Sequence, residues 1–295
     1  MSRQTLAVTA LAGLLAVPAS ADDTLVKRGA YLVNGPAACA NCHATRNPDF
    51  SIQPGMEFAG GFHIVDPAFD VLAANITPDK ETGIGDWTDE QIIRAIREGV
   101  DDEGKVIFPP MPVPTYNNMS DDDVTAIVAY LRTLAPVKHE VPDTSFWNIP
   151  QQAMPPAKGL PAPDPSDKVA YGAYIVTAIA HCFECHTPMG PQGPEMDKMG
   201  GGGFLITLAP GIDAMTPNIT PDPETGIGKW SDDEIKAAMT MGVRPDGGKV
   251  SPPMPVPWFK TMTPEDLDAV VAYLRTIPPV SNAVERTDFQ KKAFP

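Results

Sequence analysis

The chain has 295 residues, of which 37 are acidic and 22 are basic, and its formal net charge is −15. This length suits about two domains of ordinary size. The acidic excess excludes nucleic acid and anionic lipid surfaces as natural partners, because both repel a negatively charged protein. It favours a partner with a basic patch, although the same charge also serves solubility alone.

Residues 1–21 have the pattern of a secretory signal peptide. An apolar run from Leu6 to Val17 follows Arg3, and Ala19-Ser20-Ala21 is typical of a cleavage site. We therefore expect an exported, periplasmic protein whose signal is cleaved near Ala21. The apolar run is shorter than the ~20 residues that a spanning helix needs, so we predict no transmembrane segment in the mature chain.

All four cysteines lie in two Cys-x-x-Cys-His strings, which end at His43 and His186. This is the spacing of covalent haem attachment, in which two thiols reach the two vinyl groups of one porphyrin. The expected attachment residues are Cys39, Cys42, Cys182 and Cys185. His43 and His186 are then the expected proximal iron ligands. Zinc sites and redox disulfides also use Cys-x-x-Cys, but a shared four-cysteine zinc site leaves both histidines unexplained.

An internal repeat organises the chain. Cys39 and Cys182 are 143 positions apart, and the same offset pairs residues throughout both halves, such as Tyr31 with Tyr174. A stretch with eight prolines, from Pro136 to Pro165, separates the halves and predicts a semi-rigid linker. We therefore place a first domain at 22–137, the linker at 138–166 and a second domain at 167–295.

The apolar spacing predicts helices in each half. A short helix precedes each cysteine string, at residues 24–34 and 167–178. Two longer helices follow in each half, and each begins at a Ser or Thr suited to capping it: Thr88, Ser120, Ser231 and Thr263. The remaining sequence is rich in Pro and Gly and shows no alternating strand pattern. The predicted fold class is mostly α, with two tandem domains and long Pro/Gly-rich loops.

Each half also contains Pro-Pro-Met-Pro-Val-Pro, in which the methionine is Met111 or Met254. Prolines on both sides restrict the backbone, so a thioether could be held at the iron with little ordering cost. Met/His ligation raises the reduction potential, which suits an electron acceptor. Met119 and Met262 also keep the offset, but each precedes a helix N-cap, where an apolar contact is the ordinary role. We therefore expect Met111 and Met254 to be the second axial ligands.

The longest near-identical stretch of the repeat spans residues 75–87 and 218–230, where Asn-Ile-Thr-Pro-Asp is followed, after one further residue, by Glu-Thr-Gly-Ile-Gly-x-Trp. Its turn residues are explained mainly as loop geometry. The alternative is that the two asparagines, with Trp87 and Trp230, offer N–H donors to haem propionates.

With these residues the chain resembles the cytochrome c subunits of bacterial membrane-associated dehydrogenases for alcohols, gluconate and fructose. The features that carry the resemblance are Gly-x-Tyr-Leu before Cys-x-x-Cys-His, Asn-Ile-Thr-Pro-Asp, Pro-Met-Pro and the final Ala-Tyr-Leu-Arg. The resemblance implies two class I cytochrome c domains with two covalently attached haem c groups. It implies the axial pairs His43/Met111 and His186/Met254. Those subunits usually carry three haem motifs and a membrane-attaching C-terminus, whereas this chain has two motifs and a short polar tail.

The predicted function is therefore electron transfer by a periplasmic dihaem carrier, and not enzymatic catalysis. A periplasmic dehydrogenase would be the donor, and a downstream cytochrome or terminal oxidase the acceptor, both docking through basic patches. The alternative is a dihaem redox enzyme of the peroxidase or thiosulfate-oxidising type. Such an enzyme is expected to have an open iron, or a His or Cys in place of one Met.

Overall fold

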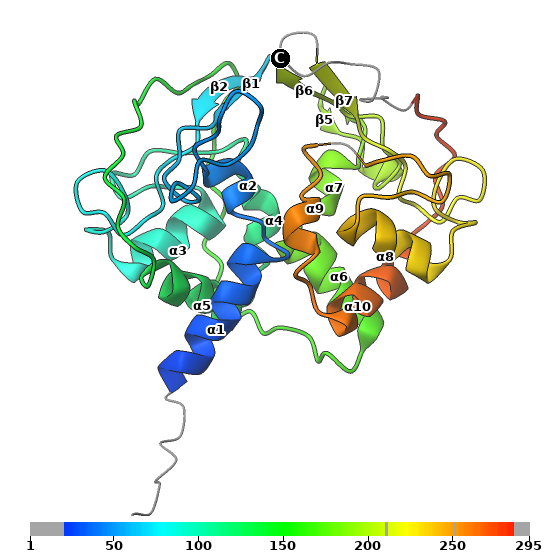
Figure 1. Cartoon of the computed structure of the whole chain (residues 1–295), viewed down its shortest axis with the longest axis horizontal. Helices are drawn as coiled ribbons and strands as arrows, with labels where there is room; N and C mark the ends of the chain where they lie inside the picture. The colour runs from blue at the N-terminus through cyan, green and yellow to red at the C-terminus, as the bar shows by residue number, and fades with distance from the viewer. Residues whose placement is uncertain (1–20, 210–211, 251, 286–295) are drawn as a thin grey trace, which may run out of the picture.

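The computed structural model describes residues 21–209, 212–250 and 252–285, so the predicted signal peptide lies outside it except for Ala21. Two helical halves lie side by side (Figure 1). The helices of the first half are α1 (Ala21–Asn34), α2 (Ala40–His43), α3 (Asp89–Glu98), α4 (Val113–Tyr116) and α5 (Asp121–Leu131). Those of the second half are α6 (Lys168–Tyr174), the π-helical turn η1 (Ile175–Ile179), α7 (Cys182–Cys185), the 3₁₀ turn η2 (Met196–Lys198), α8 (Asp232–Thr240), α9 (Val256–Phe259) and α10 (Pro264–Leu274). The mostly helical fold is confirmed.

The longer helices begin where the sequence predicts. The side chain of Thr88 accepts a hydrogen bond from the N–H of Gln91, and the side chain of Ser231 accepts one from the N–H of Glu234. The side chains of Gln91 and Glu234 in turn accept from the backbone N–H of the cap residue, which makes two capping boxes. Ser120 and Thr263 cap α5 and α10 in the same way, without the return bond. The predicted helix over 167–178 is different, because α6 continues into η1, where the N–H of Ala180 reaches back five residues.

The first and last helices of each half cross at a glycine. Gly29 of α1 lies so close to α5 that a Cβ placed there would be 1.8 Å from the carbonyl oxygen of Ala126. Gly172 of α6 lies against α10 in the same way, with 1.9 Å to the carbonyl oxygen of Ala269. Only a residue without a side chain permits this approach. The two glycines therefore fix the helix crossing that supports each cysteine string.

Short strands occur in the loops, where the sequence shows no alternating pattern. They pair antiparallel as β1–β2–β3, β4–β5 and β6–β7. Their bounds are β1 (His63–Asp66), β2 (Phe69–Leu72), β3 (Phe146–Trp147), β4 (Met189–Gly190), β5 (Gly193–Pro194), β6 (Leu205–Ala209) and β7 (Ile212–Met215). Strands of two to five residues are too short to show an alternating pattern, which explains why the sequence did not reveal them.

The proline-rich segment between the halves packs back on the first half. Its strand β3 pairs with β2, and the indole N–H of Trp147 donates to the carbonyl of Pro109 at 2.6 Å. Farther along, the carboxylate of Asp121 accepts a hydrogen bond from the N–H of Gly159 at 2.7 Å. Parts of this segment are thus held by hydrogen bonds to the first half.

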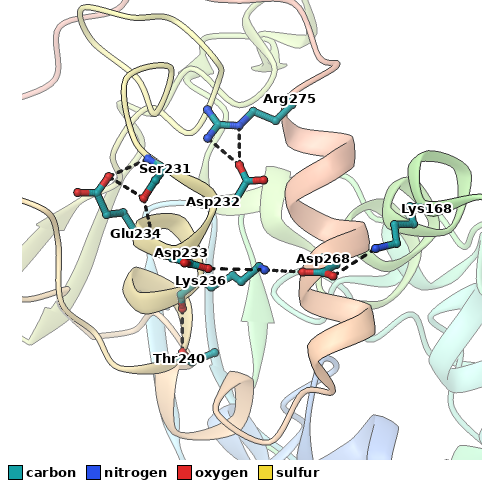
Figure 2. Close-up of polar contacts among 9 residues, drawn as sticks. All are labelled: Lys168, Ser231, Asp232, Asp233, Glu234, Lys236, Thr240, Asp268 and Arg275. Atoms are coloured by element: carbon teal, nitrogen blue, oxygen red, sulfur yellow. Dashed lines mark hydrogen bonds and ion pairs between the residues drawn. The ribbon is translucent and has the colours of Figure 1, made fainter.

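Charged side chains brace the helices of the second half (Figure 2). Asp268 of α10 accepts hydrogen bonds from Lys236 of α8 and, at 3.2 Å, from Lys168 of α6. Arg275, which follows α10, contacts Asp232 at the start of α8 at 2.9 Å. These contacts tie three helices together on the outer side of the second half.

One apolar core extends through both halves. It joins buried side chains of α1 and α5 to those of η1 and α10, and α4 of the first half contacts η1 of the second. Figure 1 shows α1 and α4 on one side of this junction and α6 and α9 on the other. Because the two halves share buried apolar side chains, they form one packed unit.

Candidate cofactor sites

Each cysteine string forms a single helical turn. Cys39 directly precedes α2 and His43 ends it, while α7 begins at Cys182 and His186 follows it. Residues three apart on a helix share a face, so both thiols of a string lie on one side. The residue before each string, Ala38 or His181, is left-handed, with φ near 48° and 43°. This unusual backbone makes the sharp change of direction from the preceding helix into the string.

Both histidine rings are held by a backbone carbonyl. His43 Nδ1 donates to the carbonyl oxygen of Ala74 at 2.8 Å, and His186 Nδ1 donates to that of Pro217 at 2.7 Å. A carbonyl only accepts, so the proton is on Nδ1 and the Nε2 lone pair is left for a metal. Burial lowers the pKa of both imidazoles, which favours the neutral, metal-binding form.

The four cysteines form no disulfide in the structure. Burial raises the pKa of Cys39, Cys182 and Cys185 to about 12, so these sulfur atoms are neutral at physiological pH. A surrounding that disfavours a charged thiolate suits the uncharged thioether that joins a cysteine to a porphyrin.

Both strings line one continuous cavity of about 2670 Å³. Its walls are largely apolar, and they include both histidines, Met111 and Met254. Within the described residues, no group of three or more His, Cys, Asp or Glu side chains is arranged to hold a metal ion without further help. A large apolar cavity with paired neutral sulfurs and two available imidazoles fits two porphyrins, and it gives a shared zinc ion no ligand cluster.

The two proline-framed methionines lie in matching turns. The N–H of Val113 donates to the carbonyl of Met111, and the N–H of Val256 donates to that of Met254, both at 2.8 Å. Both methionines are partly buried at the cavity wall. The competing methionines are packed in the core, where Met119 is 0% and Met262 is 5% exposed, as their positions before helix N-caps predict.

The Asn-Ile-Thr-Pro-Asp stretches have a structural role. The amide groups of Asn75 and Asn218 donate to the carbonyls of Val137 and Val280, at 2.9 and 2.7 Å, and are nearly fully buried. Each thereby ties the segment after the last helix back to the loop. Both asparagines and both tryptophans line the cavity, but the amide N–H groups of the asparagines already have partners within the protein. Of the donors in that hypothesis, Trp87 and Trp230 therefore remain the candidates.

Contacts between the halves lie beside the cysteine strings, and no sequence pattern predicts them. The hydroxyl of Thr115 in α4 donates to Glu184 Oε1 at 2.8 Å, and Asn41 Nδ2 donates to the carbonyl of Pro253 at 3.1 Å. Asn41 and Glu184 are equivalent by the 143-residue offset, and each lies between the cysteines of its string. Burial raises the pKa of Glu184 to about 7. The 143-residue offset shows that Asn41 and Glu184 are equivalent positions. Their contacts with the other half depend on how the two halves pack.

Within the described ranges, no helix has both the length and the apolar composition needed to cross a bilayer.

Helical domains that each present Cys-x-x-Cys-His at an apolar cavity define the c-type cytochromes. The chain belongs to the cytochrome c family, because the family's sequence profile, described as "Cytochrome c", matches residues 26–135 and 169–278. The prediction of two tandem cytochrome c domains is confirmed. Two such domains, each with its own cysteine pair, imply two covalently attached haems.

Known relatives agree with this family. The chain is 34% identical over 292 residues to the cytochrome c subunit of a quinone alcohol dehydrogenase from Gluconacetobacter polyoxogenes, covering 93% of this chain and 60% of the relative. It is 33% identical to the gluconate 2-dehydrogenase cytochrome c subunit of Pantoea cypripedii, covering 75% and 52%. It is 30% identical to a "Diheme cytochrome c-type" protein of Cereibacter sphaeroides, covering 82% of each. The chain thus spans 60% or less of the two dehydrogenase subunits.

Proposed function

We propose that the protein is an exported dihaem electron carrier that takes electrons from a periplasmic dehydrogenase and passes them to a downstream cytochrome or terminal oxidase. The observation that carries the proposal is the single cavity that both Cys-x-x-Cys-His strings line, since it brings two one-electron centres into one protein. The relatives that are dehydrogenase cytochrome c subunits support a dehydrogenase as the donor. The leader-like residues 1–21 support export to the periplasm.

The proposed iron ligands are His43 and Met111 in the first half, and His186 and Met254 in the second. The carbonyl partners of the two Nδ1 atoms support the histidines, and the proline-framed turns at the cavity wall support the methionines. Cys39, Cys42, Cys182 and Cys185 are the proposed attachment residues. If a histidine and a methionine held each iron, the iron would have no free place for a substrate, which argues against the dihaem enzyme.

When bound, haem supplies one-electron redox chemistry, and the chain supplies its surroundings. The carbonyls of Ala74 and Pro217 orient the two imidazoles and set their basicity. The apolar side chains around the cavity exclude water, which lowers the local dielectric and reduces solvent rearrangement on electron transfer. The net charge of −15 attracts a basic docking surface on the partner, and this attraction weakens as salt is added.

The ligands are tested by spectroscopy of the purified dihaem protein and its Met111→Ala and Met254→Ala variants. We expect two low-spin haems with a methionine-to-ferric charge-transfer band, and each variant should lose about half of that band, since one of two Met ligands is removed. Met119→Leu, in the core, is the matched control and should keep the full band. A high-spin haem in the wild type would contradict the proposal and favour the peroxidase type.

A further inference from the structure

The two halves contact each other through residue pairs that the 143-residue offset interchanges. The hydroxyl of Tyr31 in α1 donates to Asp266 Oδ2 at the start of α10, at 2.5 Å. Its equivalent, Tyr174 in α6, donates to Asp123 Oδ2 at the start of α5, at 2.8 Å. An interface in which residue i contacts j and the equivalent of j contacts the equivalent of i has two-fold character. The duplicated domains are therefore joined like the subunits of a symmetric dimer.

These carboxylates are buried in the junction. Asp123 is 4% and Asp266 is 8% exposed, so each needs hydrogen-bond donors to offset the loss of water. Burial raises the pKa of both Tyr31 and Tyr174, which keeps the hydroxyls protonated as donors. Removing either hydroxyl leaves a buried carboxylate without one of its partners, which is costly.

Each tyrosine also reaches the helix start that it faces. The hydroxyl oxygen of Tyr31 accepts from the N–H of Thr263 at 3.3 Å, and that of Tyr174 accepts from the N–H of Ser120 at 3.0 Å. Thr263 and Ser120 are the N-caps of α10 and α5. One phenol in each half thus holds the first turn of the other half's last helix at a fixed distance.

Toward the cavity the two sides correspond by segment and not by residue pair. Asn41, in the first cysteine string, hydrogen-bonds to Pro253 beside Met254. Glu184, in the second string, hydrogen-bonds to Thr115 in the helix that follows Met111. The haem-attachment turn of each half therefore lies against the methionine segment of the other, and one cavity serves both.

We propose that the Tyr31–Asp266 and Tyr174–Asp123 hydrogen bonds are positioning contacts for electron exchange between the two haems. They act by holding the attachment turn of each half against the methionine segment of the other. Tyr31 and Tyr174 make no contact with the haem ligands in this scheme, and they set only the relative position of the two centres. The inference rests on the proposed electron-carrier function.

The test uses the dihaem holoprotein with Tyr31→Phe, Tyr174→Phe and the double variant, which remove the hydroxyls and keep the rings. Tyr130→Phe is the matched control, because the Tyr130 hydroxyl accepts from Asn34 Nδ2, at 2.9 Å, within the first half. Asp266→Asn is the conservative variant, since its amide oxygen still accepts from Tyr31, whereas Asp266→Ala removes the acceptor.

The readout is the rate of intramolecular electron exchange, from exchange NMR of the haem methyl signals in half-reduced protein, with dilution to remove intermolecular exchange. Both reduction potentials are measured in parallel. We expect exchange to slow about tenfold for each hydroxyl lost, since each bond to a charged group contributes about that factor to the docked arrangement. Potentials should stay at wild-type values, Tyr130→Phe should match the wild type, and Asp266→Asn should exchange faster than Asp266→Ala.

An unchanged exchange rate in the double variant would overturn the inference. A slower rate that is accompanied by shifted potentials, or that Tyr130→Phe shows equally, would also overturn it, because the effect would then lie at the haems or in general stability. A wild-type protein with two His/Met haems that do not exchange electrons would overturn it too. Loss of the methionine ligand band in the wild type is the separate sign that the proposed function itself has failed.

Discussion

The two halves share the residues proposed to hold the cofactors, and they share the contact of an arginine after the last helix with the third helix, Arg132 to Asp89 and Arg275 to Asp232. They differ in the lysine–aspartate contacts that link three helices of the second half. In the second half, Asp268 binds Lys168 and Lys236 (Figure 2). At the equivalent positions the first half has Thr125, Leu25 and Ile93. The first half instead holds the proline-rich segment, through β2 and Asp121. Duplication thus preserved the cofactor pocket and left the outer surface free to change.

The junction between the halves has one clear asymmetry. Arg28 donates two hydrogen bonds to Asp123, at 2.7 and 2.9 Å, in addition to the bond from Tyr174. The residue equivalent to Arg28 is Tyr171, so no equivalent arginine faces Asp266. Both sides of the junction have the Tyr–Asp hydrogen bond. Only the Asp123 carboxylate also has Arg28 to neutralise its charge.

The largest expected effect is the loss of one haem when one cysteine string is removed, which tests whether the two cofactor sites are independent. The double variants Cys39→Ala/Cys42→Ala and Cys182→Ala/Cys185→Ala should each carry one haem per chain, because each string attaches its own porphyrin. Haem content per chain, from a pyridine haemochrome assay and the protein mass, measures this. Met241→Leu, at an exposed position that does not line the cavity, serves as the control and should keep two haems. Loss of both haems from either variant would show that the halves do not load independently.

The next effect tests whether the helix crossings are equivalent. Gly29→Ala and Gly172→Ala should each lower the free energy of unfolding by about 1–3 kcal/mol, because the added methyl group clashes with a backbone carbonyl. Chemical denaturation of the dihaem protein measures this. Thr24→Ala, at an exposed position of α1, should change the stability by less than about 0.5 kcal/mol. A neutral glycine variant in one half would mean that only the other crossing is tightly packed.

Arg28 tests the asymmetry of the junction. Arg28→Met should lower the free energy of unfolding by about 1.5–3 kcal/mol, since it removes hydrogen bonds between a charged donor and a buried carboxylate. Tyr171→Phe is the control from the other half, because its hydroxyl makes only a 3.5 Å contact with Arg28. Equal denaturation midpoints for the two variants would contradict a special role for Arg28.

The smallest effect concerns acid stability. Hydrogen bonds from Lys236 and then Lys168 hold the pKa of Asp268 below its usual value. A carboxyl with a lowered folded-state pKa stabilises the fold above its ordinary pKa, and this contribution is lost as the pH falls through the lowered value. Asp268→Asn should therefore reduce the acid sensitivity of the second half alone, by a small amount because the pair is exposed.

The acid transition is measured by the haem methyl NMR signals of each half as the pH is lowered below 4. Asp233→Asn is the control, because that side chain is 98% exposed and lies 4.0 Å from Lys236. If the first half responds to Asp268→Asn as strongly as the second, the brace does not act locally.

Much of this protein could be predicted from residues that are close in the chain. Helix starts at Thr88, Ser120 and Ser231 depend on a cap and its next three residues, and each was predicted correctly. The haem strings are equally local, since two cysteines and a histidine within five positions define the attachment. The short strands were missed because two to five residues carry too little pattern. The ligand assignment to Met111 and Met254 is still a prediction.

The sequence by itself determined the duplication, the helix starts, the two haem strings and the acidic charge, because each depends on short-range chemistry or on composition. Only the tertiary structure decided how the halves meet. The bonds of Tyr31 to Asp266 and of Tyr174 to Asp123 join residues more than fifty positions apart. The histidines depend on backbone carbonyls at Ala74 and Pro217, which every residue type provides and no side-chain pattern can reveal. Such contacts arise from packing, where any of many pairings is locally possible and the buried core selects one.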